Sequence, residues 1–254
     1  MLYVCVPSHD EAATVGLLLW RIRQVFSQAP REYEFLVADD GSTDATAEVL
    51  ASYQRALPLT VVRQPGRLGT ARSTEALLRL AVARSDRLKR DVAVVMHADF
   101  AHAPAMLPDV MRALDGGTDV VVVEGRLPDA APRGRRWLRR FGPLLVRSRI
   151  GVPEVTDLFT GFVAGRLVCV RNMLRAGGEP CLRTDGYAAR AELIGRLVRH
   201  GRSLEVLQSA EREDLRQRAS RLDPSAEAMA LWRARAALAL PPRDAAPPRE
   251  PAAP

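Results

Sequence analysis

Two adjacent carboxylates, Asp39 and Asp40, stand directly after the apolar run 35–38 and are followed by Gly41 and Ser42. A strand that ends in this way leads into a tight turn and a helix, because Gly41 permits a sharp backbone and Ser42 can cap a helix. Successive side chains of a strand point in opposite directions, so one carboxylate can anchor the turn while the other faces the crevice above the sheet. Open α/β sheets bind ligands in that crevice.

Asp, Gly and Ser are also common in ordinary turns, so this motif alone is weak evidence for a site. Two further apolar runs end in ionisable residues: 2–6 is followed by Asp10 and Glu11, and 92–96 by His97 and Asp99. Three strand ends that deliver such groups to one edge favour a binding site.

The apolar segments alternate between strand and helix lengths, which predicts an α/β fold with a mainly parallel sheet. Strands are expected near 2–6, 33–38, 59–63, 91–96 and 118–123. The 254 residues are 47% hydrophobic, enough to form one domain over residues 1–240. Residues 241–254 are rich in Pro and Ala, and we expect them to form a disordered tail.

The three cysteines are odd in number and lack metal-ligand spacing, so free thiols in a reducing cytoplasm are expected. The chain opens directly into a strand, without the basic flank and apolar core of a secretory signal. Since no apolar run approaches the roughly 18 residues of a membrane span, any membrane contact is expected to be peripheral.

The segment 133–149 holds seven arginines and no acid, which equals the net charge of +7 on the whole chain. It also places Trp137, Phe141 and Leu144 at helical spacing, and Gly142–Pro143 is expected to divide it into two short helices. A basic amphipathic segment over 133–151 suits an anionic membrane surface or a lipid phosphate. The alternative is a solvated helix docked on the core. Nucleic acid is disfavoured, because no recognised nucleic-acid motif accompanies the arginines.

Six segments, in chain order and within roughly residues 1–210, resemble the family 2 glycosyltransferases with the GT-A fold, specifically the dolichol-phosphate mannose synthase and polyprenyl-phosphate sugar transferase branch. They are 7–11, 37–46, 67–71, 96–104, 157–162 and 186–192. The resemblance implies an inverting transfer of a hexose from a nucleotide-diphosphate sugar, of the GDP-mannose or UDP-glucose type, to a polyprenyl phosphate. It implies a cytoplasmic enzyme held peripherally at the inner face of the cell membrane.

The same resemblance implies roles for individual residues. Those expected to bind substrate are Pro7, Asp10, Glu11, Asp40, Gly69, Thr160, Gly161 and Arg166. Those expected to take part in catalysis are Asp99, Asp157 and Glu192. Arg166 is the next guanidinium after the 157–162 motif that is available for a phosphate. For Glu192, the alternative to orienting a basic group or the acceptor is a surface salt bridge.

A nucleoside diphosphate leaves with several negative charges, which a divalent cation normally neutralises. His97 and Asp99 are two residues apart in an extended segment, so both can face the same Mg²⁺ or Mn²⁺ ion. The family usually has Asp where this chain has His97, which indicates either an altered metal preference or lost activity. Asp10 replaces the family's usual Asn, which leaves the base preference open.

The oxygen of a lipid phosphate is already ionised near neutral pH, so its attack needs positioning more than a general base. The chain accordingly lacks the Glu-Asp base motif of family members that glycosylate hydroxyls. The alternative within the enzyme class is transfer to a sugar hydroxyl or a small molecule. Outside it, the alternative is a catalytically silent GT-A domain that binds a nucleotide or an anionic membrane.

Overall fold

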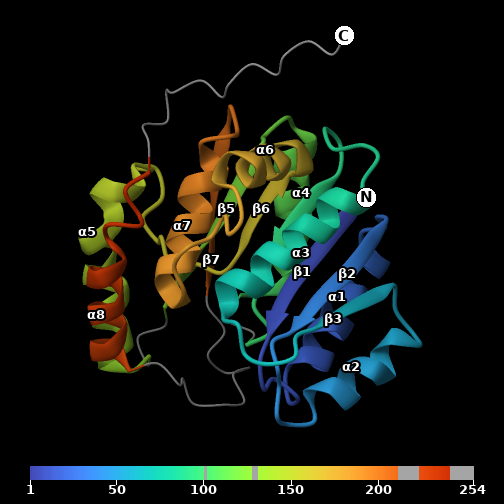
Figure 1. The fold of residues 1–254 in the computed structure, drawn as a ribbon. Coiled ribbons are helices and arrows are strands. Elements are labelled where there is room, and N and C mark those ends of the chain that lie inside the picture. The colour runs from blue at the N-terminus through green and yellow to red at the C-terminus, as the bar shows by residue number, and fades with distance from the viewer. Residues whose placement is uncertain (100–101, 128–130, 211–222, 241–254) are drawn as a thin grey trace.

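The computed structural model describes residues 1–99, 102–127, 131–210 and 223–240. Its centre is a seven-stranded sheet with the strand order β3-β2-β1-β4-β6-β5-β7 (Figure 1). The strands are β1 (Leu2–Ser8), β2 (Tyr33–Asp39), β3 (Leu59–Arg63), β4 (Val92–Val95), β5 (Val120–Arg126), β6 (Val163–Arg166) and β7 (Leu204–Ala210). Within this sheet the pairs are parallel except those of β6, which runs antiparallel to β4 and β5.

Helices cover both faces of the sheet, so the fold has three layers, as predicted for a GT-A fold. The core on one face includes α1 (Val15–Gln28), α2 (Thr46–Gln54), the 3-10 helix η1 (Pro104–Met106) and α4 (Leu107–Asp115). The core on the other face includes α3 (Thr70–Arg84), α5 (Arg133–Ile150), α6 (Leu167–Gly177), α7 (Gly186–Val198) and α8 (Pro224–Ala234).

The five predicted strands are confirmed, and β6 and β7 are additions that the sequence did not reveal. The expected break at Gly142–Pro143 is wrong, because α5 runs through Pro143 as one helix. Proline removes one helical hydrogen bond at a cost of about 3 kcal/mol, which the burial of Leu138, Val146 and Ile150 offsets. Gly142 permits the close packing, since a Cβ there would lie 2.7 Å from the Phe159 ring.

The three cysteines are free thiols, and all three are buried. No helix in the described ranges has both the length and the apolar character needed to cross a membrane. The predicted tail at 241–254 lies outside the described residues.

Candidate active site

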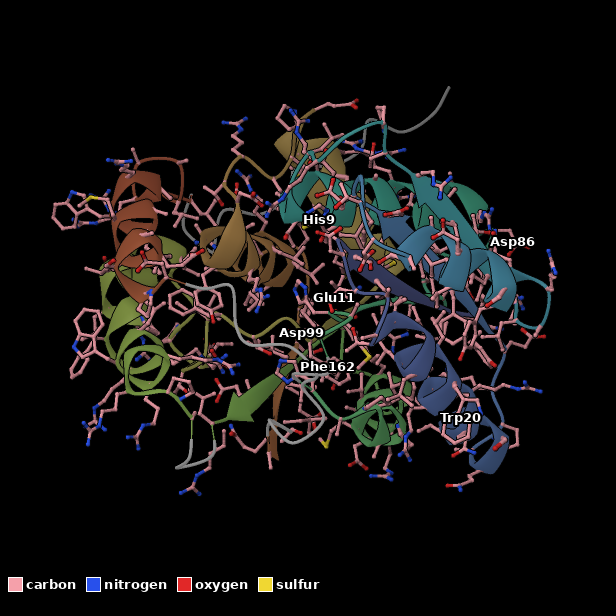
Figure 2. All side chains as sticks on the ribbon, turned by 90° about the horizontal axis from the view of Figure 1, so that it is seen from below. His9, Glu11, Trp20, Asp86, Asp99 and Phe162 are labelled. Atoms are coloured by element: carbon pink, nitrogen blue, oxygen red, sulfur yellow. The ribbon has the colours of Figure 1, made fainter. Side chains whose placement is uncertain are left out.

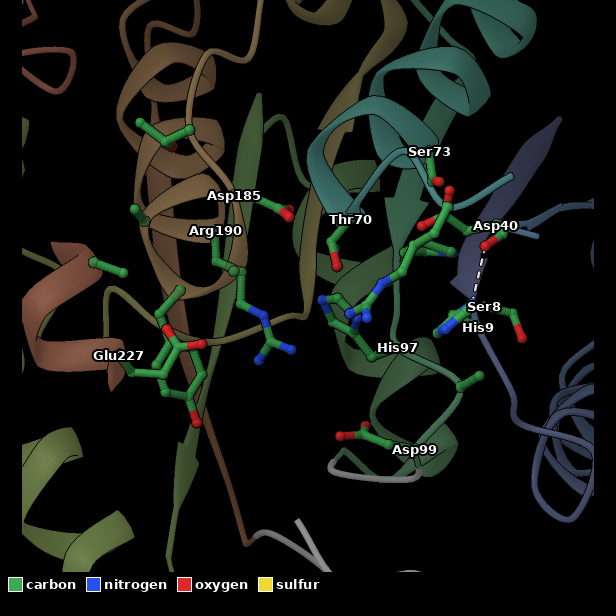
Figure 3. A pocket seen from close by; sticks show the side chains of 18 of the residues that line it. Ser8, His9, Asp40, Thr70, Ser73, His97, Asp99, Asp185, Arg190 and Glu227 are labelled. Atoms are coloured by element: carbon green, nitrogen blue, oxygen red, sulfur yellow. Dashed lines mark hydrogen bonds between the residues drawn. The ribbon is translucent and has the colours of Figure 1, made fainter. Parts of the chain in front are cut away.

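The carboxyl ends of β1, β2 and β4 meet at one edge of the sheet, where they open into a cleft of about 770 Å³ (Figures 2 and 3). Predicted site residues come to it from all three strand ends: Pro7, Glu11, Asp40, His97 and Asp99. Parallel strands bring their carboxyl ends together, which is why residues far apart in the chain share this edge.

Asp39 and Asp40 divide their roles as the strand alternation predicts. Asp39 anchors the turn, because its Oδ1 accepts the backbone N–H of Ser42 at 3.0 Å. The buried Asp40 carboxylate accepts the N–H groups of Leu68 at 2.8 Å and Gly69 at 2.9 Å. Asp40 thereby holds the loop that leads into α3 against the cleft.

Asp10 ties two loops together rather than lining the cleft. Its backbone has φ of 50°, a left-handed conformation that Asp tolerates better than most residues. Its N–H donates to Oγ of Ser42, and its Oδ1 accepts the N–H of Thr43 at 2.8 Å. The turn fixed in this way presents Glu11, whose carboxylate accepts the Thr14 hydroxyl at 2.7 Å.

Thr160 and Gly161 form the floor beneath the end of β4. The Thr160 hydroxyl donates to the carbonyl of Val123 at 2.5 Å and lies 3.2 Å from Nε2 of His102. Because that hydroxyl proton is used, Nε2–H of His102 is the donor between the two side chains. Gly161 lies directly against His97, so that a Cβ on Gly161 would overlap the imidazole ring.

Asp157 reaches the cleft through another residue. Its carboxylate accepts the N–H of Phe159 at 3.1 Å and forms an ion pair with Arg139, which does line the cleft. Buried Glu124 holds this segment, because its Oε1 accepts the N–H of Asp157 at 2.9 Å. Burial acts to raise the pKa of Glu124, but hydrogen bonds from Gln208, Asp157 and Thr156 outweigh it and keep that pKa below its usual value.

Glu192 is completely buried, so the alternative of a surface salt bridge is wrong. Its Oε2 accepts the backbone N–H groups of Arg183 at 2.9 Å and Thr184 at 3.0 Å, together with the Thr184 hydroxyl. Its Oε1 accepts Nε of Arg196 at 2.8 Å. Glu192 therefore positions Arg183 and Thr184, both of which line the cleft.

Arg166 is not part of the cleft. It pairs with Val92 at the start of β4, because β6 runs antiparallel to β4 and therefore ends at the side of the sheet away from the cleft. Its guanidinium donates to the carbonyls of Lys89, Leu114 and Thr118. Arg166 therefore joins loops, and the prediction that it contacts a phosphate is wrong.

The cleft is also lined by arginines that were not predicted to bind substrate: Arg67, Arg135, Arg139, Arg183, Arg190 and Arg233. The four-residue spacing of Arg135 and Arg139 was the available signal, since it places both on one face of a helix. Arg190 stacks over the Tyr187 ring at 5.1 Å and donates to the carbonyl of Phe159 at 3.2 Å. Figure 3 shows its side chain extending across the cleft toward His97.

Three of these guanidinium groups act on His102, which is buried beside the cleft. Burial, reinforced by Arg139, Arg190 and Arg135 against the opposing effect of Asp99, lowers the pKa of His102 to about 3. The imidazole is therefore neutral at physiological pH. Glu227 also lines the cleft. Burial raises its pKa, although the hydrogen bond from the N–H of Tyr187 and the charge of Arg190 act to lower it.

Asp99 and His97 are the residues at the end of β4 that could hold a cation. Across the described ranges, no three His, Cys, Asp or Glu side chains gather as a metal-binding group. His97 supplies an imidazole where the family usually has a carboxylate, and the Arg190 guanidinium extends toward it (Figure 3). The arrangement is a poor fit for Mg²⁺ or Mn²⁺, because a cation there would meet one carboxylate and a nearby positive charge.

The glycosyl transferase family 2 model matches residues 3–174. The dolichol-phosphate mannosyltransferase of Pyrococcus furiosus is 30% identical over 171 residues, which are 64% of this chain but only 45% of that protein. The undecaprenyl-phosphate mannosyltransferase of Micrococcus luteus is 27% identical over 204 residues, 78% of each chain.

Among solved structures, glucosyl-3-phosphoglycerate synthase of Mycobacterium tuberculosis matches with a TM-score of 0.62 and 21% identity. The match covers 94% of this chain and 78% of that one. The same synthase has been crystallised with Mn²⁺ and UDP. At this identity the likeness shows the GT-A fold alone. The family model covers more than half of the sequence, and the chain therefore belongs to glycosyl transferase family 2.

Proposed function

We propose that this glycosyltransferase moves a hexose from a nucleotide-diphosphate sugar, of the GDP-mannose or UDP-glucose type, to a polyprenyl phosphate. The relatives named as dolichol-phosphate and undecaprenyl-phosphate mannosyltransferases support the acceptor class. The UDP complex of the structural neighbour supports a nucleotide donor. The observation that carries the proposal is the cleft itself, in which a strand-end wall faces a wall of guanidinium groups.

The strand-end wall is the proposed donor side. Pro7, Glu11 and Asp40 surround the place where the base and ribose would lie, and Thr70 begins α3 beside it. A helix N-terminus favours anions, so the diphosphate would extend from Asp40 toward Thr70.

The guanidinium wall is the proposed acceptor side. Its acceptor groups are Arg135 and Arg139 of α5, whereas Arg190 of α7 extends from this wall toward the donor side (Figure 3). A lipid phosphate carries charge that planar guanidinium groups bind with paired hydrogen bonds. In this proposal Asp157 and Glu192 are positioning residues, because they hold Arg139 and the 183–184 loop.

In the reaction, a phosphate oxygen of the acceptor forms a bond to the anomeric carbon while the bond from that carbon to the donor diphosphate breaks. The electron pair of the broken bond leaves on the nucleoside diphosphate. In-line attack inverts the carbon and gives a β-linked product from an α-linked donor. No proton has to be removed from the acceptor, because its oxygen is already ionised. Since the strand-end donors fit a divalent cation poorly, no step is assigned to one.

We propose that the enzyme attaches peripherally to the cytoplasmic face of an anionic membrane through an exposed surface on α5 and α8, here called the α5–α8 surface. It consists of large apolar side chains that are 42% to 66% exposed: Trp137, Phe141, Leu144, Met229 and Trp232. Arg133, Arg136 and Arg140 are exposed on the same helix α5. Cationic side chains beside exposed Trp and Phe suit the headgroup region of an anionic bilayer.

The opposite face of α5 carries Arg135 and Arg139 into the cleft. One helix would therefore contact the membrane with one face and the acceptor phosphate with the other. A second copy of the chain suits the α5–α8 surface less well, because symmetric contact would place arginines against arginines.

The proposed reaction is tested by incubating the purified chain with a panel of GDP- and UDP-sugars and a polyprenyl phosphate, with Mn²⁺, with Mg²⁺ and with EDTA. Lipid-linked product is read by mass spectrometry beside an Asp99→Asn variant. We expect a glycosylated lipid that the variant makes much more slowly. Nucleotide binding without lipid product from any donor would contradict the proposal and favour a hydroxyl acceptor or a silent domain.

A further inference from the structure

We propose that guanidinium groups of the cleft, with Arg190 foremost, hold the diphosphate of the donor in the role that a divalent cation was expected to have. The inference rests on the proposed function only in taking the ligand to be a nucleoside diphosphate. It assigns the charge neutralisation to residues of this chain, so that nucleotide binding does not require a metal.

The first line of argument is the charge at the end of β4. His97 supplies an imidazole rather than a second carboxylate, and Asp99 is the carboxylate that accompanies it. Around the adjacent His102 ring, the charges of Arg135, Arg139 and Arg190 oppose that of Asp99. The described lining of the whole cleft holds six arginines and five carboxylates, and a positive balance of this kind favours a polyphosphate over a cation.

The second line of argument is the way in which Arg190 is held. Its guanidinium stacks on Tyr187, which in turn stacks on Phe159 with ring centroids 5.0 Å apart. The carbonyl of Phe159 accepts one terminal nitrogen at 3.2 Å. The buried Nε has no hydrogen-bond partner among the described residues. The group is thus fixed in place while keeping donor capacity for a ligand.

The acids of the same wall are engaged by backbone groups. Glu227 accepts the N–H of Tyr187 and is also influenced by the charge of Arg190, and Asp185 accepts the N–H of Ala71 at 3.3 Å. The Arg190 side chain nevertheless extends into the cleft, toward His97 and the start of α3 (Figure 3).

Arg190 in this position provides what the leaving group needs. As the bond from the anomeric carbon to the diphosphate oxygen breaks, the electron pair moves onto that oxygen. A fixed guanidinium can donate hydrogen bonds to it without rearranging during the reaction. Gly161 contributes by leaving room for the His97 ring, which forms the floor of this subsite.

The test is calorimetric titration of the purified chain with UDP and with GDP, in EDTA and in Mn²⁺. We expect wild-type affinity to be retained in EDTA, and Arg190→Gln to weaken binding in EDTA by roughly 10- to 100-fold. Arg190→Lys keeps the charge but loses the planar fork of donors. Its affinity for the nucleotide is expected to lie between those of the wild type and Arg190→Gln. The matched control is Arg23→Gln, which removes one exposed arginine from α1 and is expected to bind like the wild type.

Loss of nucleotide binding in EDTA, or unchanged affinity in folded Arg190→Gln, would overturn the inference. If Arg190→Gln fails to fold, the EDTA comparison on wild-type protein and the Arg190→Lys variant still decide it. Metal-independent binding without lipid-linked product would reject the proposed acceptor and leave the inference standing. Nucleotide binding and lipid-linked product that both appear only with Mn²⁺ would overturn the inference and leave the proposed acceptor standing.

Discussion

Gly69 donates its backbone N–H to Oδ2 of Asp40 across 2.9 Å, although the two residues are 29 positions apart in the chain. Gly69 has φ of 96°, a conformation that favours glycine, and a Cβ there would lie 2.5 Å from Asp185. The carboxylate at the end of β2 therefore sets where α3 begins and how close its N-terminus comes to the cleft wall.

Asp40→Asn is expected to destabilise the protein and weaken nucleotide binding. An amide turns an NH₂ group toward one of the two backbone donors that now meet a carboxylate oxygen. Loss of such a buried hydrogen bond costs about 1–3 kcal/mol. Urea unfolding measures the effect. The control Asp109→Asn, which breaks only an exposed pair with Arg112, is expected to change stability by less than about 1 kcal/mol. Equal effects of the two variants would count against this role.

Gly161→Ala is expected to displace the His97 ring, which it would overlap. A displacement of about 1 Å in an active site can reduce kcat/KM by about 100-fold. Steady-state kinetics with the preferred donor measures this effect. Gly66→Ala is the matched control, because a Cβ at Gly66 meets no atom within 4 Å. Wild-type kinetics for Gly161→Ala would show that the position of His97 does not matter.

Glu192→Gln is expected to cost about 3–5 kcal/mol of unfolding free energy, because it leaves the charge of Arg196 without its buried partner. It also turns an amide toward the N–H groups of Arg183 and Thr184, so KM is expected to rise as the cleft lining loosens. Urea unfolding and kinetics measure the two effects. Glu48→Gln alters an exposed carboxylate and serves as the control. A stability loss no larger than that of the control would contradict this account.

His102 predicts a pH dependence of stability. Its folded pKa is lowered to about 3 from 6.5, so the unfolded chain binds a proton that the folded protein does not. Stability from this group is complete above pH 6.5 and is lost as the pH falls toward 3. His102→Gln should flatten the slope of unfolding free energy between about pH 7 and about pH 5 by up to about 1.4 kcal/mol per pH unit. Parallel slopes for the two proteins would argue against a neutral buried His102.

The sequence predicted the parts of the fold that rest on continuous apolar runs. The strand Val120–Arg126 begins with four consecutive valines, and its first five residues are buried. By contrast β6 is four residues long and contains Gly165 and Arg166, and β7 alternates irregularly at the edge of the sheet. Because β6 was not predicted, the position of Arg166 was predicted wrongly. The antiparallel direction of β6 places Arg166 beside the start of β4, away from the strand ends that form the cleft.

The basic segment was recognised as one unit, but its two faces could not be separated without knowing what it packs against. Arg135 is 5% exposed, and the Arg139 side chain is 8% exposed, so both point inward. Arg136 and Arg140 on the same helix are exposed. Arginines and apolar residues occur on both faces of this helix, so the sequence pattern does not show which face is buried.

That division into faces yields a prediction for the membrane. Replacing the outward arginines Arg133, Arg136 and Arg140 together by Gln is expected to weaken binding to vesicles rich in anionic phosphatidylglycerol. Each arginine contributes about 1 kcal/mol near such a surface, so the triple variant should lose about 100-fold in affinity. Sedimentation with vesicles measures the loss, and raising the salt concentration should abolish the difference.

Trp137→Ala combined with Trp232→Ala tests the apolar part of the α5–α8 surface. Both side chains are more than half exposed and border the same groove of about 640 Å³ between α5 and α8. Their loss should weaken binding to anionic vesicles and, unlike the loss of charge, should do so equally at high salt. The charge control removes three exposed arginines elsewhere, as Arg21→Gln, Arg23→Gln and Arg55→Gln. If that control weakens binding as much as the α5 triple variant, attraction is set by net charge, and α5 is not the face that meets the membrane.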